Sequence, residues 1–417
     1  MRKWLLLVLL LAAAAAVTGC QTIRFYGQAI RGQYQILANQ TSVDELIADP
    51  ETPEELRRQL QLVRQLRAFA DTNLALPVDG HYARYVDVRR PYVVWNVQAA
   101  PPFSLEAKTW WYPLVGSLEY RGYFSKRGAE AAAARLERKG YDVFISGVDA
   151  YSTLGWFKDP VLNTFIHRSE AELAELIFHE LAHQRVFARG DTDFNEAFAT
   201  MVGTEGAQRW LRAHGDTNQF EAYLASLRQE EEFVRLVMDA RAKLERLYGD
   251  VRDRDGNLRA AGKPPAPAAE LQAGKERILA ELRRDYAELK ARWQNDRYDA
   301  WFERELNNAQ LNTIANYYDY VPGFQALLKL EGGEMAAFYE AAERLANMPK
   351  EERHRWLRDL ANEGGGGGDE NIQHRTSNIE HPTSNEWGRE HSTLIANGRG
   401  SFRSAEHCVS ACRNPAF

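Results

Sequence analysis

The sequence predicts a predominantly helical α+β fold, with a small sheet before a central helix and a long helical hairpin after it. Most of the chain repeats apolar residues every three or four positions, the period of a helix that is buried on one face. Between about residues 80 and 150 the pattern changes to short runs rich in aromatic and β-branched residues, which are typical of strands. Two long amphipathic segments between about residues 217 and 300 predict the hairpin.

The elements before the central helix follow from these patterns and from their caps. We expect helices over residues 42–75, with Ser42 as the first cap and a break at Pro50 and Pro53. Strands are expected at 81–88, 92–97 and 141–148, further aromatic runs lie at 110–113 and 120–124, and Ser125 is expected to cap an Ala-rich helix that ends at Gly140.

The elements after the central helix are all expected to be helical. The central helix is expected to end near Gly190, and the next helix to run from Asp191 to about Gly215. The hairpin helices cover 220–247 and 271–293 around a Gly- and Pro-rich linker at 249–268, and further helices cover 299–331, with a break at 321–323, and 333–360.

The first twenty residues are typical of a lipoprotein signal. Arg2 and Lys3 precede an apolar run, residues 4–17, that is too short to span a membrane comfortably. The following Val17-Thr18-Gly19-Cys20 resembles the lipobox of bacterial lipoproteins. That resemblance implies a signal peptide at 1–19, a lipid anchor on Cys20 and a place on the bacterial cell envelope, on the periplasmic face of the outer membrane.

Composition argues against some binding partners and against some kinds of metal site. The net charge of −6 argues against nucleic acid as a partner. No cysteine lies between Cys20 and Cys408, so the expected folded body, residues 20–362, has neither a disulfide nor a thiolate metal site. Any zinc in the body must therefore be held by His and carboxylate side chains.

The C-terminal end differs from the body. Five consecutive glycines, residues 364–368, are followed by a seven-residue repeat that begins at Asn371 and again at Asn378. The repeat has no heptad of apolar positions, which excludes a coiled coil. We therefore expect residues 363–417 to form a Gly-rich linker and a disordered tail.

The central helix carries the motif His179-Glu180-Leu181-Ala182-His183. Side chains four positions apart lie on one face of a helix, so His179 and His183 can bind one metal ion, with Glu180 close to a water on that ion. Ser169 and Glu172 have the spacing of a capping box. The rest of the helix is apolar, and polar side chains inside such a helix need a partner, which a metal ion would supply. The sequence therefore predicts a zinc site.

A catalytic zinc needs a third protein ligand. Glu196 is the preferred candidate because it lies early in the next helix, which can return antiparallel to the first. Asp191 and Asp193 are alternatives, although both stand where helix caps are expected. Glu196 has its own alternative role, since Asp193 and Glu196 have the spacing of a helix cap. Thr200, one turn later, is expected to hydrogen-bond a ligand.

The motif with the later Asn195-Glu196-Ala197-Phe198-Ala199 resembles the gluzincin metallopeptidases, although the twelve residues between His183 and Glu196 are fewer than usual there. More narrowly, the chain over about residues 25–360 resembles a family of bacterial predicted aminopeptidases. The stretches that carry this resemblance are 94–97, 120–124, 150–157 with Asp159-Pro160, 178–184, 194–196, 306–309 and Val321-Pro322.

This resemblance implies a zincin-like zinc peptidase that acts on a peptide substrate. His179, His183 and Glu196 would bind Zn²⁺, Glu180 would act as general base, and Tyr317 would stabilise the oxyanion. Residues 150–155 stand where zincins place the strand that pairs with substrate. Asp149 and Asp159 are weak candidates for binding a substrate amino group. An envelope endopeptidase, a cell-wall peptide amidase and a non-catalytic zinc-stabilised binding protein stay open.

Overall fold

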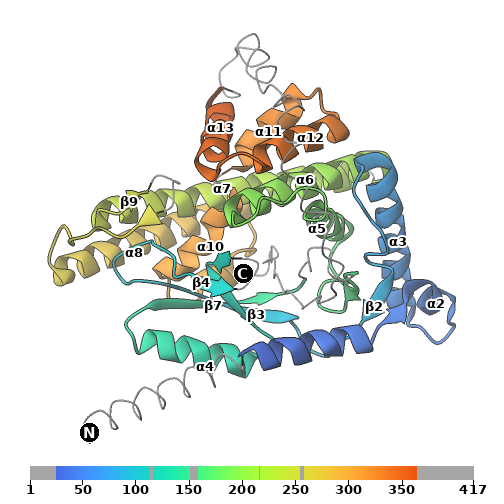
Figure 1. The fold of residues 1–417 in the computed structure, drawn as a ribbon, viewed down its shortest axis with the longest axis horizontal. Helices are drawn as coiled ribbons and strands as arrows, with labels where there is room; N and C mark the ends of the chain where they lie inside the picture. The colour runs from blue at the N-terminus through green and yellow to red at the C-terminus, as the bar shows by residue number, and fades with distance from the viewer. Residues whose placement is uncertain are drawn as a thin grey trace, which may run out of the picture.

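The computed structural model describes residues 25–112, 116–150, 158–215, 217–253, 258–318 and 320–363. This part of the chain is predominantly helical with small sheets, which confirms the predicted α+β class. Figure 1 shows a sheet and α4 at one side, the central helices in the middle and the last three helices at the opposite side. The predicted signal peptide with Cys20 and the predicted tail lie outside the described residues.

The N-terminal helices pack on the central helix. Residues 25–38 are helical, and α2 (Val43–Ala48) begins with Ser42 as its cap, as predicted. α3 (Glu54–Leu74) buries one apolar face, and its Phe69 ring lies 6.0 Å from Phe178 of the central helix. Each fully buried apolar side chain of this kind contributes about 2 kcal/mol to folding.

The three-stranded antiparallel sheet has β3 (Val94–Ala100) in the middle, β6 (Tyr120–Tyr123) on one side and β7 (Asp142–Val148) on the other. Successive side chains of a strand point to opposite faces. Trp95 and Val97 therefore share one face and pack on α4 (Lys126–Glu137), which Ser125 caps as predicted. The other face of the sheet looks toward the helices that carry the candidate site.

The predicted strand at 81–88 is wrong in its extent. The strand formed is β2 (Arg84–Val86), because Tyr82 and Arg89 adopt positive φ angles of 56° and 52° that an extended strand cannot contain. β2 pairs with β1 (Thr41–Ser42) and β8 (Val161–Leu162), and a separate pair joins β4 (Trp110–Tyr112) and β5 (Gly116–Leu118).

Two long helices form the hairpin that the sequence predicts. They are α7 (Thr217–Tyr248) and α8 (Ala268–Trp293), and the predicted linker contains a short antiparallel pair, β9 (Val251–Arg252) and β10 (Leu258–Arg259). The hairpin shares a separate apolar cluster with the following helices, which fixes it to the body.

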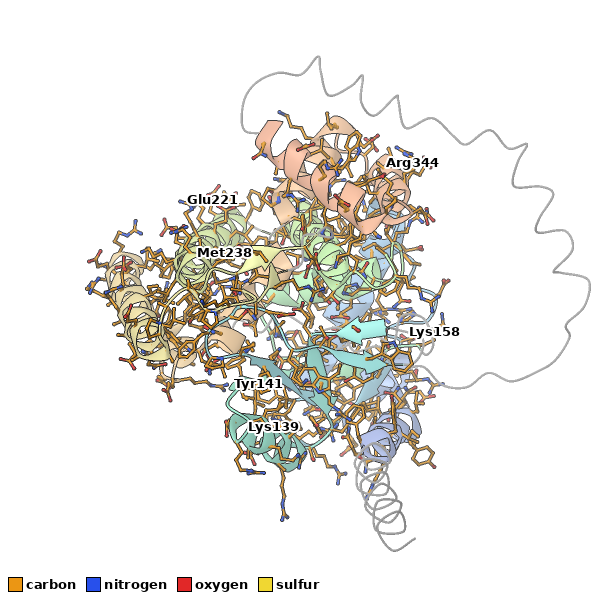
Figure 2. The ribbon with its side chains drawn as sticks, turned by 60° about the vertical axis from the view of Figure 1, so that its left-hand side comes forward. Lys139, Tyr141, Lys158, Glu221, Met238 and Arg344 are labelled. Carbon is orange, nitrogen blue, oxygen red and sulfur yellow. The ribbon has the colours of Figure 1, made fainter. Side chains whose placement is uncertain are left out.

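The last five helices are shorter than predicted. They are α9 (Asp299–Phe302), α10 (Asn308–Tyr318), α11 (Val321–Leu330), α12 (Met335–Ala346) and α13 (Lys350–Glu363). The second of the two expected segments is divided because residues 347–349, with Pro349, separate α12 from α13. Figure 2 shows Arg344 of α12 at one end of the molecule and Lys139, just after α4, at the other. In the described part of the chain, no helix has both the length and the apolar character needed to cross a bilayer.

Candidate metal centre

The central helix α5 (Glu170–Ala182) begins with the predicted capping box. Ser169 accepts a hydrogen bond from the Glu172 amide, and the Glu172 carboxylate accepts one from the Ser169 amide. The prediction that this helix ends near Gly190 is wrong. His183 is its C-cap, and the Gln184 and Arg185 amides donate to carbonyls three residues earlier. This tighter turn starts the reversal of the chain, which must bring Glu196 back within twelve residues.

The connection to α6 (Thr192–His214) is held by two side chains. Asn195 accepts a hydrogen bond from the Ala188 amide at 2.7 Å and donates one to the Ala188 carbonyl at 2.8 Å. Asp191 is the N-cap and accepts from the Phe194 amide. The alternative role of Glu196 as part of a cap with Asp193 is therefore wrong, because the N-cap is Asp191 and Asp193 already lies inside the helix.

Close packing of α5 and α6 sets the distance between their side chains. A Cβ atom on Gly203 would lie 2.7 Å from the Glu175 carbonyl oxygen and 3.1 Å from the Cβ of His179. One turn later, a Cβ on Gly206 would lie 2.7 Å from the Phe178 ring. Only glycine permits this approach, so α6 can lie against the helix that carries both histidines.

The two helices bring His179, His183 and Glu196 together. One ligand atom from each of the three side chains lies within 4.8 Å of the other two. The Glu196 Oε2 atom is 3.5 Å from His179 Nε2 and 3.8 Å from His183 Nε2. All three side chains are buried, and both helices contribute many residues to the main apolar cluster.

Burial keeps both imidazoles neutral. It lowers the pKa of His179 from 6.5 to about 3 and that of His183 to about 4, against the opposing effect of the Glu196 charge on His183. Their contacts with Glu196 are therefore not salt bridges at neutral pH. Neutral imidazole is the form that binds metal ions.

The residues fit a zinc ion. His179 Nε2 is buried and makes no hydrogen bond to any residue that the structure describes, although burying such an atom costs free energy. Two imidazole nitrogens and one carboxylate oxygen are the ligand set of many catalytic zinc sites, which keep a fourth position open. The adjacent Glu180 is also buried, with 1% of its surface exposed.

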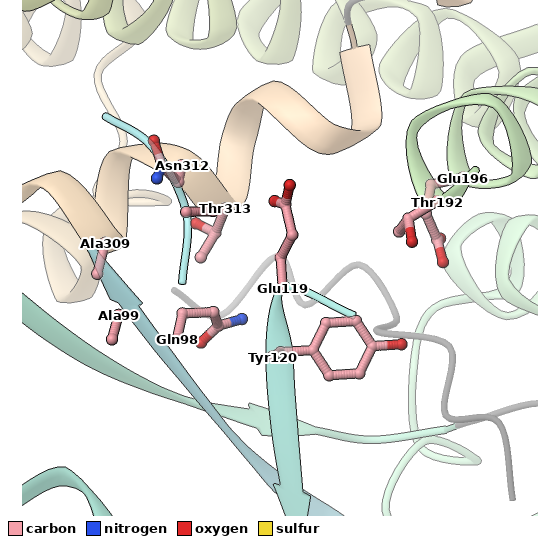
Figure 3. Close-up of a pocket in the computed structure, with 10 residues that line it drawn as sticks. Gln98, Ala99, Glu119, Tyr120, Thr192, Glu196, Ala309, Asn312 and Thr313 are labelled. Carbon is pink, nitrogen blue, oxygen red and sulfur yellow. The ribbon is translucent and has the colours of Figure 1, made fainter. Parts of the chain in front are cut away.

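A pocket lies beside this cluster and includes Glu196 in its wall (Figure 3). Sequence reasoning did not assign its other lining residues to the site, because all of them except Thr192 come from the sheet, from the loops after β3 and before β6, or from α10, far away in the chain. They are Gln98, Ala99, Ala107, Glu119, Tyr120, Thr192, Ala309, Asn312 and Thr313.

Other predicted site residues lie elsewhere. Asp191 and Asp193, the alternative ligands, are not members of the cluster. Asp149 pairs with Arg168, and Asp159 lies 3.3 Å from His81. These contacts occupy both acids that were considered for binding a substrate amino group.

Three further expectations concern residues near the site. The Oγ1 atom of Thr200 is buried and makes no hydrogen bond to the residues that the structure describes, which contradicts its expected hydrogen bond to a ligand. Tyr317 belongs to α10, but its side chain lies outside the described part of the structure. The same is true of residues 151–157, most of the stretch that was expected to pair with substrate.

The C-terminal helix α13 fixes the start of α6. His354 donates a hydrogen bond of 2.8 Å to Asp191, and Tyr320 lies 3.0 Å from the other His354 nitrogen. Burial opposes ionisation of Asp191, but the His354 hydrogen bond and the charges of His354, Lys350 and Arg353 outweigh it and lower the pKa of Asp191. The helix that carries Glu196 is therefore anchored by a charged group at its N-cap.

A family model described as "Putative aminopeptidase" matches residues 24–357. The chain belongs to this family. Among curated proteins and among solved structures, nothing matched. The zincin-like architecture and the relation to gluzincins therefore stay predictions, while membership of the aminopeptidase family confirms the narrower resemblance.

We predict that Gly203→Ala weakens zinc binding. The added methyl group meets a backbone oxygen at 2.7 Å, so the helices must separate, at a cost of about 1–3 kcal/mol. Zinc affinity measured by competition with a chelator should fall, whereas Gly262→Ala, where a Cβ meets nothing within 4 Å, should leave it unchanged. Equal affinity of the Gly203 variant and the wild type would contradict this account.

Asp191→Asn should lower the free energy of unfolding by about 2 kcal/mol at pH 7, because His354 and Arg353 lose a buried charged partner. The folded-state pKa of Asp191 lies below the ordinary 3.8, so its stabilisation is present above that pH and lost as the pH falls below it. Denaturant unfolding from pH 7 to pH 3 should show the variant and the wild type converging. If the free energies of unfolding of variant and wild type differ by the same amount across this range, the charge of Asp191 is not the cause of the difference. Asp71→Asn, at an exposed position, is the control.

Proposed function

We propose that the protein is a zinc-dependent aminopeptidase that binds its metal through His179, His183 and Glu196. The observation that carries the proposal is the convergence of two neutral imidazoles and one carboxylate beside a pocket. Membership of the aminopeptidase family supports the reaction class. Zinc is proposed as the metal because two imidazoles and one carboxylate are a common ligand set for it.

When bound, zinc supplies a Lewis acid and lowers the pKa of a bound water to about 7. Glu180 follows His179 on α5 and is the candidate general base. Its carboxylate takes a proton from the attacking water and passes it to the leaving amine. Tyr120, in the pocket wall, and Tyr317 are the two candidate phenols for hydrogen bonding to the developing oxyanion.

The alternatives use the same residues. An endopeptidase or a cell-wall peptide amidase would share the metal ligands and Glu180, and would differ in the ends of the substrate that it accepts. A non-catalytic zinc protein would need the three ligands but no carboxylate at position 180. Glu180, buried next to a ligand, therefore favours catalysis.

We predict that Glu180→Gln keeps about one zinc per chain and lowers kcat by about 10²–10⁴-fold, because the ligands remain while the proton acceptor is lost. Metal analysis and hydrolysis of free and N-acetylated peptides measure both effects. Equal activity of variant and wild type would remove Glu180 from the mechanism. In the same assay, Tyr120→Phe and Tyr317→Phe decide which phenol contributes.

In the same experiment, Glu196→Ala should reduce the zinc content. Glu205→Ala is the matched control. It removes from the same helix a carboxylate that pairs with Arg209 at 2.8 Å. Zinc lost equally from both variants would indicate damage to α6 and not the loss of a ligand. Zinc retained by Glu196→Ala would exclude Glu196 from the ligand set.

We also propose that the protein is anchored to the bacterial envelope through a lipid on Cys20. The support is the sequence Val17-Thr18-Gly19-Cys20 after a signal-like apolar run. In a bacterial host, Cys20→Ser should move the protein from the membrane fraction to the soluble fraction and abolish incorporation of labelled fatty acid. Labelling that persists in the variant would contradict a lipid on Cys20.

A further inference from the structure

The face of the central sheet that looks toward the candidate site carries polar side chains between apolar ones. On β3, Asn96 and Gln98 lie on the face opposite to the one that packs on α4. Asn96 is paired with Ser146 of β7, and Gln98 with Tyr120 of β6, so these side chains share that face. Gln98 and Ser146 also hydrogen-bond each other at 3.4 Å. A sheet face inside a protein is usually apolar, so this polarity needs a reason.

Asn96 is the clearest example of a polar side chain on this face whose burial needs an explanation. It is 0% exposed, and neither its amide nitrogen nor its amide oxygen hydrogen-bonds to any residue that the structure describes. Leaving both atoms unsatisfied costs about 1–3 kcal/mol for each group. Asn96 itself does not line the pocket, but Gln98, two residues further along the same face, does.

The pocket next to this face carries a second carboxylate. Glu119, between β5 and β6, points its carboxylate into the space between α10 and the start of α6, where Glu196 lies (Figure 3). Among the residues that the structure describes, the pocket lining includes these two carboxylates and no basic side chain. Arg241 lies behind the wall, where it donates to Asn312. With Glu196 neutralised by a metal ion, Glu119 would remain as the negative charge of the pocket.

We propose that Glu119 binds the α-ammonium group of the substrate, while the amide of Gln98 hydrogen-bonds the backbone of its first residue. This inference rests on the proposed peptidase function. It assigns to Glu119 the preference of the enzyme for substrates with a free amino terminus. The α-nitrogen is only two bonds from the carbonyl carbon of the first peptide bond. Its counter-ion must therefore line the same pocket as a metal ligand, and Glu119 does.

Binding to a catalytically impaired protein tests this subsite without requiring turnover. The probes are tripeptide amides that differ in their first residue, each with a free or an acetylated amino terminus. They are titrated into the zinc-loaded full chain carrying Glu180→Gln. We expect the free form of the preferred peptide to bind at least about tenfold more tightly than its acetylated form.

Glu119→Gln, added to this background, should abolish the preference for the free amine, and Glu119→Asp should restore part of it. Glu130→Gln is the matched control, because this exposed carboxylate lies on α4, behind the opposite face of the sheet. Equal binding of free and acetylated peptides, a preference that survives Glu119→Gln, or no binding of any probe would overturn the subsite.

The two proposals fail in different ways. If the wild type hydrolyses free peptides but not acetylated ones and Glu119→Gln leaves this preference unchanged, the aminopeptidase function stands and the subsite is wrong. If free peptides bind through Glu119 but the wild type hydrolyses none of them, the subsite stands and the peptidase function is wrong.

Discussion

The contact between α5 and α6 at Gly203 is the constraint on which the candidate site depends. The two helices approach so closely that a single Cβ atom would meet the opposite backbone at 2.7 Å. This approach places a carboxylate from one helix beside two imidazoles from the other, next to the main apolar cluster. Apolar burial supplies the free energy that holds the polar groups together, and it also makes both imidazoles neutral.

Each wall of the site belongs to a different part of the fold. The helix pair supplies the candidate metal ligands, and the sheet with α10 supplies the pocket that faces them. The C-terminal helices fix the N-cap of α6 through the hydrogen bond between Asp191 and His354. The site therefore depends on elements from nearly the whole described chain, which agrees with a family match that extends over residues 24–357.

The features that the sequence predicts well are local ones. The capping box at Ser169, the cap at Ser42 and the two hairpin helices each depend on residues a few positions apart. The histidine pair is local in the same sense. Glu196 lies only twelve residues beyond His183, so the length of the connection limits where it can be.

The features that escaped prediction depend on distant contacts. The central helix ends at Ala182 because the chain must reverse there, although the apolar pattern continues to Ala188. Glu119 and Gln98 reach the pocket only through the pairing of β3 with β6. The close packing at Gly203 and Gly206 could have been predicted, because two glycines three residues apart in a predicted helix indicate close packing against a neighbour.

The pairing of Asp191 with His354 joins residues 163 positions apart. During synthesis, Asp191 and both histidines leave the ribosome long before α13 exists. The N-cap of α6 then lacks its charged partners, so the arrangement around Glu196 is incomplete. Order in the candidate site thus develops late, and a chain that stops before α13 would have all the ligand residues without the contacts that hold them in place.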